Sequence, residues 1–283
     1  MNHLKFTKKA IATFSIIALI FTSCSKDETV ETDVTQKETS ELKLSAEIDT
    51  ASDAIDDVMI EVYENQEGDE TGKMPNVNRP NFLPDCVTIT AVIEQGFREI
   101  TVDFGAEGCL INGNNLKGKV IMSYDREASD REVLITYTLE DFYINAKHIL
   151  GSKTILKQLE NENGNPQFAH TLDLTVIWPS GAQASRQGLK VREWVEGFGS
   201  GVFSDNVFKI TGNWTSTFVN GNSHSYEVVI PLRRQMSCYY VVSGSIAVSR
   251  NNFSGVFDYG TGDCDNSATF TFNSGDVIDI VLN

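Results

Sequence analysis

The sequence predicts a mainly β fold: an antiparallel sandwich or an open half-barrel of roughly twelve strands, preceded by one amphipathic helix. Three observations support this fold class. From Cys86 to the end of the chain, one run after another alternates apolar and polar residues, as expected for sheets with one buried and one solvated face. Pairs typical of tight hairpin turns, such as Asn163-Gly164 and Asn220-Gly221, separate the runs. The segment before Cys86 instead has the three-to-four-residue spacing of a helix.

The helix is expected within residues 43–85, which we divide into an amphipathic helix and a linker that contains three prolines. One face of this helix is apolar and is formed by Leu44, Ile48, Ala51, Ile55, Val58 and Val62. The opposite face carries carboxylates, namely Glu47, Asp49, Asp53, Asp56, Asp57, Glu61 and Glu64. We expect the apolar face to pack on the sheet, and a coiled-coil partner is the alternative.

Residues 86–283 form the predicted β domain. The alternating residues expected to face its core are Phe168, His170, Leu172, Leu174, Val176, Trp178, Phe208, Ile210, Trp214, Phe218, Tyr226, Val228, Ile230, Leu232, Ala268, Phe270 and Phe272. The apolar phase slips between Leu139 and Phe142, which predicts a β-bulge near Glu140-Asp141. An open sheet with the helix on its concave side would resemble the half-barrel of lipoprotein carriers.

Residues 1–23 predict a signal peptide. Three lysines precede an apolar run from Ala10 to Phe21, which is too short for a membrane-spanning helix of about 20 residues. The run ends in Thr22-Ser23-Cys24 and resembles bacterial lipoprotein signals, although Phe21 stands where those signals usually have Leu. The resemblance implies that Cys24 becomes the first residue and carries diacylglycerol and an N-acyl chain such as palmitate. The alternative is an ordinary cleaved signal in which Cys24 is incidental.

Residues 24–42 are predicted to be an acidic, solvated tether because they contain no aromatic residue and many carboxylates. Lys26-Asp27-Glu28 within this segment is similar to the acidic export signal of lipoproteins from the Bacteroidetes group, which implies the outer membrane and the cell surface. A generic acidic tether, with no targeting role, is the alternative.

The charge of the chain excludes some partners. Residues 1–23 contain three lysines and no carboxylate, so the rest of the chain holds 20 basic and 39 acidic residues, a formal charge of −19. Nucleic acids and anionic lipid surfaces require a basic footprint and are therefore excluded as partners. Cations, neutral glycans and proteins remain.

The cysteines follow a repeated pattern. VDFGAEGC ends at Cys109 and FDYGTGDC ends at Cys264, and each follows a hairpin that begins at another cysteine, Cys86 or Cys238. Because the two ends of a hairpin lie close together, we predict the disulfides Cys86–Cys109 and Cys238–Cys264 in an oxidising compartment. The fifth cysteine, Cys24, is assigned to the lipid. A metal site made by the four cysteines is disfavoured, since no C-x-x-C spacing occurs.

Few residues suggest chemistry, and we predict no enzymatic activity. The three histidines after the signal are scattered, no nucleophile or metalloprotease motif occurs, and carboxylate pairs such as Glu193 with Glu196 are unspecific in so acidic a chain. Calcium is the one candidate cofactor, with the ligands Asp258, Asp263, Asp265 and Asn266. Turn formation by these residues is the alternative. Trp194 is the candidate ligand-binding aromatic residue, because Trp178 and Trp214 follow the buried alternation.

The signal, the acidic tether and the two cysteine hairpins together resemble outer-membrane lipoproteins of the Bacteroidetes group, a resemblance that implies no activity. Three hypotheses follow. The first is a non-catalytic, lipid-anchored module that binds a glycan, a protein or an envelope partner. The second is a periplasm-facing carrier that shelters an apolar ligand between helix and sheet, and the third is an envelope hydrolase. A large apolar cavity would favour the carrier, an exposed aromatic patch the binding module, and two carboxylates across a cleft the hydrolase.

Overall fold

The structure is a computed structural model that describes residues 28–68, 80–127, 130–250 and 253–282. The chain divides into two compact units, residues 1–39 and residues 40–283. In the first unit the described residues, 28–39, are helical. The second unit contains the rest of that helix and the whole sheet.

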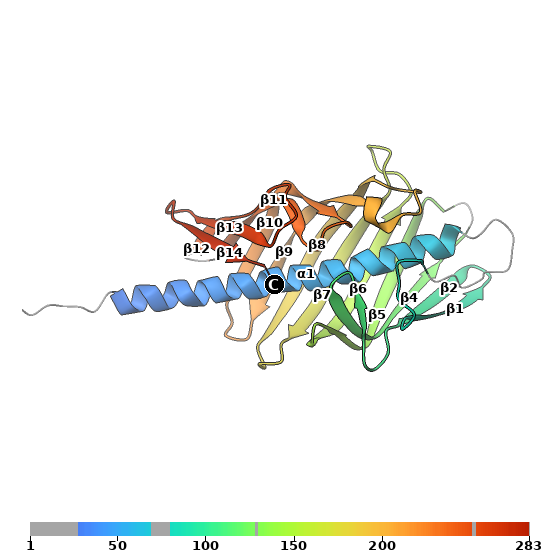
Figure 1. Cartoon of the computed structure of the whole chain (residues 1–283), viewed down its shortest axis with the longest axis horizontal. Helices are drawn as coiled ribbons and strands as arrows, with labels where there is room; N and C mark the ends of the chain where they lie inside the picture. Colours follow the sequence, from blue (N-terminus) through green and yellow to red (C-terminus); the bar gives the residue numbers. More distant parts are fainter. Residues whose placement is uncertain (1–27, 69–79, 128–129, 251–252, 283) are drawn as a thin grey trace, which may run out of the picture. The chain divides into compact units, whose positions relative to one another are not determined.

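The second unit is mainly β, as predicted. Its described residues form fourteen strands of one open antiparallel sheet (Figure 1). Strands that follow each other in the chain are paired, except that both β2 and the short β3 pair with β4. The strands are β1 (Thr88–Glu94), β2 (Phe97–Asp103), β3 (Cys109–Ile111), β4 (Asn114–Asp125), β5 (Glu132–Ile144), β6 (Lys147–Gln158), β7 (Gln167–Ile177), β8 (Gln183–Glu196), β9 (Val207–Phe218), β10 (Ser223–Gln235), β11 (Val241–Arg250), β12 (Phe253–Thr261), β13 (Ser267–Phe272) and β14 (Val277–Val281). A short 3-10 helix, Phe203–Asp205, lies between β8 and β9. Of the two predicted forms, the open sheet is confirmed and the sandwich is not observed.

One helix, α1 (Glu28–Gly68), precedes the sheet and begins inside the segment predicted to be a solvated tether. The predicted start of the helix, at residue 43, was therefore too late. The chain has no glycine or proline from Glu28 to Glu67, and once a helix is nucleated each further residue adds a hydrogen bond. Side chains are already buried at Glu41 and Leu42, so the packed part of the helix starts before residue 43.

The apolar face of α1 packs on the sheet, as predicted. Ile48, Ile55 and Val62 belong to a core shared with the first strands, and Leu42 and Ala46 belong to a second core shared with the last strands. Figure 1 shows residues 40–68 of the helix lying along one face of the sheet, which we call the inner face. Every residue from Ala51 to Ile60 is buried, so the sheet covers more than the apolar face of the helix.

The predicted alternation holds along most strands. His170, Trp178 and Trp214 are buried as expected. The β-bulge near Glu140-Asp141 is confirmed by a register shift between β4 and β5 and by the positive φ of Asp141. The prediction that Ile230 faces the core is wrong, because its side chain is 57% exposed. The register of β10 shifts between Val228 and Leu232 against both neighbouring strands, and such a shift turns alternate residues to the other face.

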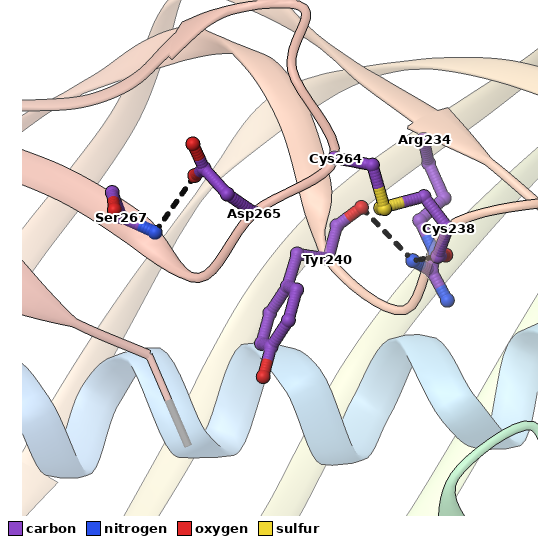
Figure 2. The surroundings of a disulfide bond; sticks show 6 residues. All are labelled: Arg234, Cys238, Tyr240, Cys264, Asp265 and Ser267. Carbon is purple, nitrogen blue, oxygen red and sulfur yellow. Dashed lines mark hydrogen bonds between the residues drawn. A yellow bond between two sulfur atoms is a disulfide. The ribbon is translucent and has the colours of Figure 1, made fainter.

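Both predicted disulfides are present. The Cα atoms lie 5.9 Å apart in Cys86–Cys109 and 5.7 Å apart in Cys238–Cys264. The repeated Asp-aromatic-Gly sequence makes the same turn beside each bridge: the Asp103 and Asp258 carboxylates accept a hydrogen bond from the backbone N–H two residues later, at 2.8 and 2.7 Å. In Figure 2 the Arg234 guanidinium lies below the second bridge and donates to the carbonyl of Cys238 at 2.6 Å.

Candidate functional site

The acidic face of α1 is buried against basic side chains from the sheet. Its buried carboxylates are Glu41, Asp49, Asp53, Asp56 and Asp57. The strands present buried basic residues to them from the inner face, namely Lys153, Lys157, His170, Arg186, Lys190, Arg192, His224 and Arg234. Because a charge inside a protein is costly unless it is paired, these residues form ion pairs along the helix.

Asp56 lies at the centre of this charged interface and is fully buried. Its Oδ1 is 2.5 Å from the Lys153 Nζ and 3.4 Å from the His170 Nδ1, and its Oδ2 is 3.8 Å from an Arg192 nitrogen. Burial alone would raise the pKa of the Asp56 carboxyl, but the neighbouring His170 ring and the charges of Lys153 and Arg192 hold it well below its usual range. Burial lowers the pKa of His170 to about 4. At neutral pH the imidazole is therefore uncharged, and the two other basic residues balance Asp56.

The same pairing extends along the helix from Glu41 to Glu67. The nearest pairs are Glu41 with His224 (2.7 Å), Glu47 with Lys147 (3.1 Å), Asp49 with Arg186 (2.5 Å), Asp53 with Lys190 (3.0 Å), Asp57 with Arg192 (2.5 Å), Glu64 with Lys157 (2.5 Å) and Glu67 with Arg126 (2.9 Å). Glu61 is the exception: among the described residues, no basic side chain lies within 4.0 Å of it. Its carboxylate Oε1 instead accepts a hydrogen bond from the Asn206 side-chain amide.

Glu61 faces a cleft of about 730 Å³ that we call the aromatic cleft. The cleft is formed by the last turns of α1, the residues before β1, and the segment between β8 and β9. Its aromatic lining is Phe82, Trp194, Phe198 and Phe203, and its polar lining is Glu61, Glu64, Asn65, Asn81, Ser204 and Asn206. This volume and this mixture of rings with a few polar groups are typical of small-molecule sites.

The rings of the aromatic cleft are held in place by one another. Phe82 stacks on Phe203 with centroids 4.3 Å apart, and Phe198 meets the edge of Trp194 at 5.0 Å. The indole N–H of Trp194 donates to the carbonyl of Glu196 at 2.8 Å. Trp194 is only 4% exposed whereas Phe198 is 52% exposed. Trp194 therefore forms a fixed wall, and Phe198 is the most exposed of the four rings, since Phe82 and Phe203 are half-buried.

The segment that carries Phe198 depends on a glycine. Gly197 has a φ of +87°, and a Cβ at this position would lie 2.6 Å from the carbonyl oxygen of Asp205. The two ends of the β8–β9 connection can therefore approach each other only with glycine at this position. This close approach brings Asn206 to Glu61.

The two carboxyl groups of the aromatic cleft are hard to ionise. Burial, together with the neighbouring Glu64 and Asp57, raises the pKa of Glu61 to about 7. Burial also raises the pKa of Glu64, although Lys157 acts in the opposite direction. Glu61 can therefore bind or release a proton near neutral pH, depending on what occupies the cleft.

The structure brings one sequence-predicted site residue, Trp194, into this site. Three of the four proposed calcium ligands, Asp258, Asp263 and Asp265, line one pocket of about 400 Å³. Asp258 caps the Asx turn described above, and the carboxylate of Asp265 accepts a hydrogen bond from the backbone N–H of Ser267 at 2.9 Å (Figure 2). Among the described residues, no three His, Cys, Asp or Glu side chains are placed to hold a metal ion. Calcium stays a prediction, and Cys24 lies outside the described residues.

The sequence reasoning missed the other rings of the cleft. Phe198 and Phe203 lie within a glycine-rich run, GFGSGVF from 197 to 203, and aromatic residues in such a loop are a recognisable signal for a binding site. Phe82 gives no such signal, because it follows a proline-rich segment and enters the site only through the fold. Glu61 was recognised as part of the acidic face, but its lack of a basic partner is a tertiary property.

Comparisons with protein-family models, with curated proteins and with solved structures find no match to this chain. Within the described residues, none of the helical structure is both long enough and apolar enough to cross a membrane. The proposed function is therefore based on the geometry of the aromatic cleft and of the charged interface.

Proposed function

We propose that this protein is a non-catalytic binding module, anchored by a lipid on Cys24 at the outer membrane, that holds a small ligand in the aromatic cleft. The observation that supports it is the cleft itself. Its volume of about 730 Å³ suits a small molecule, its rings contact one another, and its lining combines the exposed Phe198 with polar groups of α1 and Asn206.

The carrier hypothesis has less support. Two spaces lined by both α1 and the inner face hold only about 20 and 10 Å³. To shelter an apolar ligand there, the protein would have to move α1 away and expose buried ion pairs such as Asp56 with Lys153. The contacts of α1 therefore favour a helix that stays in place.

The hydrolase hypothesis also has less support. Glu61 and Glu64 lie one turn apart on the same helix, not across the cleft from each other, and Glu64 is paired with Lys157. Among the described residues that line the cleft there is no histidine or cysteine. Of the carboxylate pair noted in the sequence, Glu193 accepts hydrogen bonds from Asn163 and Asn165, which leaves it poorly placed to act as an acid or base.

The lipid anchor makes a first prediction. Cells fed an alkyne analogue of palmitate should label the wild-type chain in the outer-membrane fraction, and Cys24→Ala should lose both the label and that location. Ser23→Ala, which keeps a small residue before the cysteine, is the matched control and should retain both. Protease added to intact cells should then remove the β domain. Protection until the outer membrane is permeabilised would place the domain in the periplasm and overturn the cell-surface part of the proposal.

Ligand binding in the aromatic cleft makes a second prediction. In protein labelled with 5-fluorotryptophan, a small-molecule library that includes neutral glycans and amines should contain members that shift the ¹⁹F signal of Trp194 but not those of Trp178 and Trp214. Phe198→Ala should weaken these ligands at least about fivefold, since the ring contributes roughly 1 kcal/mol of contact.

Val219→Ala is the matched control for this experiment, because it removes an exposed apolar side chain outside the cleft. It should leave the affinities unchanged. A library in which no member moves the Trp194 signal, or in which Phe198→Ala changes nothing, would exclude the aromatic cleft as a binding site.

A further inference from the structure

The inference concerns the charge of the ligand and rests on the proposed function. Nine carboxylates occur on α1 between Glu41 and Glu67. Eight of them have a basic partner within 4.0 Å, and among the described residues Glu61 alone has none. The unpaired carboxylate is also the one that faces the aromatic cleft.

No described residue that lines the cleft can balance the charge of Glu61. Its described lining contains no lysine, arginine or histidine. The charged groups that act on Glu61 are Glu64 and Asp57. Both are acidic and already paired, Glu64 with Lys157 and Asp57 with Arg192 and Arg234. From the β8–β9 connection it meets Asn206, a neutral donor. An anionic carboxylate in a partly desolvated, aromatic environment is costly without a cation.

The neighbouring turn of the helix shows what a completed pair looks like in this protein. The Lys157 ammonium lies 2.5 Å from Glu64 and 4.7 Å from the centre of the Tyr63 ring, with the Phe168 ring at 5.9 Å. An ammonium is thus bound by a glutamate of α1 and by aromatic faces. The aromatic cleft offers the same groups, a glutamate and several rings, without the ammonium.

We propose that the aromatic cleft binds a small organic ammonium ion whose N–H groups donate to Glu61 and whose apolar part lies against Trp194, Phe198 and Phe203. An anionic ligand would meet two carboxyl groups, Glu61 and Glu64. A neutral glycan would leave Glu61 without a counter-charge. A bare metal ion would find too few ligands, since the described residues offer no cluster of three. The net charge of −19 for residues 24–283 likewise favours a cationic ligand.

The test compares three probes of similar size on the full-length lipoprotein in non-ionic detergent, with Trp194 ¹⁹F shifts as the readout. The probes are 2-phenylethylammonium, the neutral 2-phenylethanol and the anionic phenylacetate. At pH 8 the ammonium should bind about tenfold or more tightly than the alcohol, because a charge-assisted hydrogen bond replaces a neutral one. Phenylacetate should bind more weakly than either.

Glu61→Gln should lower the affinity for the ammonium by about tenfold or more and leave that for the alcohol within about twofold. Glu160→Gln removes an exposed carboxylate outside the cleft and is the matched control; it should preserve the preference. In the wild type, the affinity for the ammonium should fall about tenfold between pH 8 and pH 6, because Glu61 becomes protonated, and Glu61→Gln should abolish that fall. The pH series needs no variant and therefore does not depend on how Glu61→Gln folds.

Tighter or equal binding of the alcohol, or a preference that survives in Glu61→Gln, would overturn the ammonium assignment while leaving the aromatic cleft as a binding site. Failure of all three probes to move the Trp194 signal would also overturn it. The library experiment then separates the ammonium assignment from the proposed binding function. A neutral glycan that shifts the ¹⁹F signal of Trp194 would support the binding function, and a library in which no member shifts that signal would overturn the binding function as well.

Discussion

Asp56→Ala is expected to lower the free energy of unfolding at pH 7 by about 3–5 kcal/mol, the usual cost of breaking a buried ion pair from one side. Asp56 is fully buried, and its removal leaves Lys153 without its 2.5 Å partner and Arg192 with one carboxylate fewer. Urea denaturation of the wild type and the variant measures this loss. Asp173→Ala removes an exposed aspartate from the outer side of β7 and should change stability by no more than about 0.5 kcal/mol.

A double variant shows whether the lost stability comes from losing the attraction between Asp56 and Lys153 or from leaving the Lys153 ammonium buried without a partner. If the loss comes from the unpaired Lys153 ammonium, Asp56→Leu combined with Lys153→Met should be more stable than Asp56→Ala alone, because apolar residues of similar size can replace a buried pair at little cost. A loss below about 1 kcal/mol for Asp56→Ala would instead show that water reaches the charged interface and that its pairs are worth no more than surface pairs.

The ion pairs also explain why the cleft can be preorganised. Apolar contacts alone would let α1 slide or rotate on the inner face, but a row of charges permits one register only, because any other places unpaired charges in the core. On either side of Glu61, Asp57 is fixed by Arg192 and Arg234, and Glu64 by Lys157. The Glu61 carboxylate is therefore held on a rigid support, as binding sites require.

The β fold could be predicted from the sequence because its signals are local. Alternation along strands such as β7 and paired turn residues such as Asn220-Gly221 depend on neighbours in the chain, and the hairpins then determine which cysteines meet. The charged interface could not be predicted in the same way. Arg186, Lys190 and Arg192 occupy inward positions of β8, but charges are normally exposed, and their partners on α1 lie more than a hundred residues earlier in the chain.

The candidate site was predictable only in part for the same reason. Trp194 was recognised because Trp178 and Trp214 follow the buried alternation, although its own side chain is a buried wall of the cleft and not the exposed ring. Phe198, the exposed ring, and Glu61, the unpaired carboxylate, gain their roles when α1 and the β8–β9 connection meet. A single sequence contains the residues of such a site but not their proximity.

His170→Leu is expected to change how stability depends on pH. The pKa of His170 is lowered to about 4 in the folded protein, against an ordinary value near 6.5 in the unfolded chain. Between these values the unfolded chain binds more protons, so His170 makes the wild type lose stability as the pH falls from about 6.5 to 4, by roughly 3 kcal/mol in all. Leucine has a similar size and removes this contribution.

Glu61 has the opposite effect on how stability depends on pH, so the contributions of the two residues can be told apart. Its pKa is raised to about 7, so between about pH 7 and 4.5 the folded protein binds more protons and gains stability on acidification. The two contributions oppose each other in the wild type. In His170→Leu only the stabilisation from protonating Glu61 remains. Urea denaturation between pH 7 and 4.5 should therefore show that the free energy of unfolding of this variant rises relative to that of the wild type as the pH falls. The double variant His170→Leu with Glu61→Gln should not show this rise.

If the stability of His170→Leu depends on pH as that of the wild type does, His170 is already protonated beside Asp56. The charged interface then carries one more positive charge than its geometry indicates.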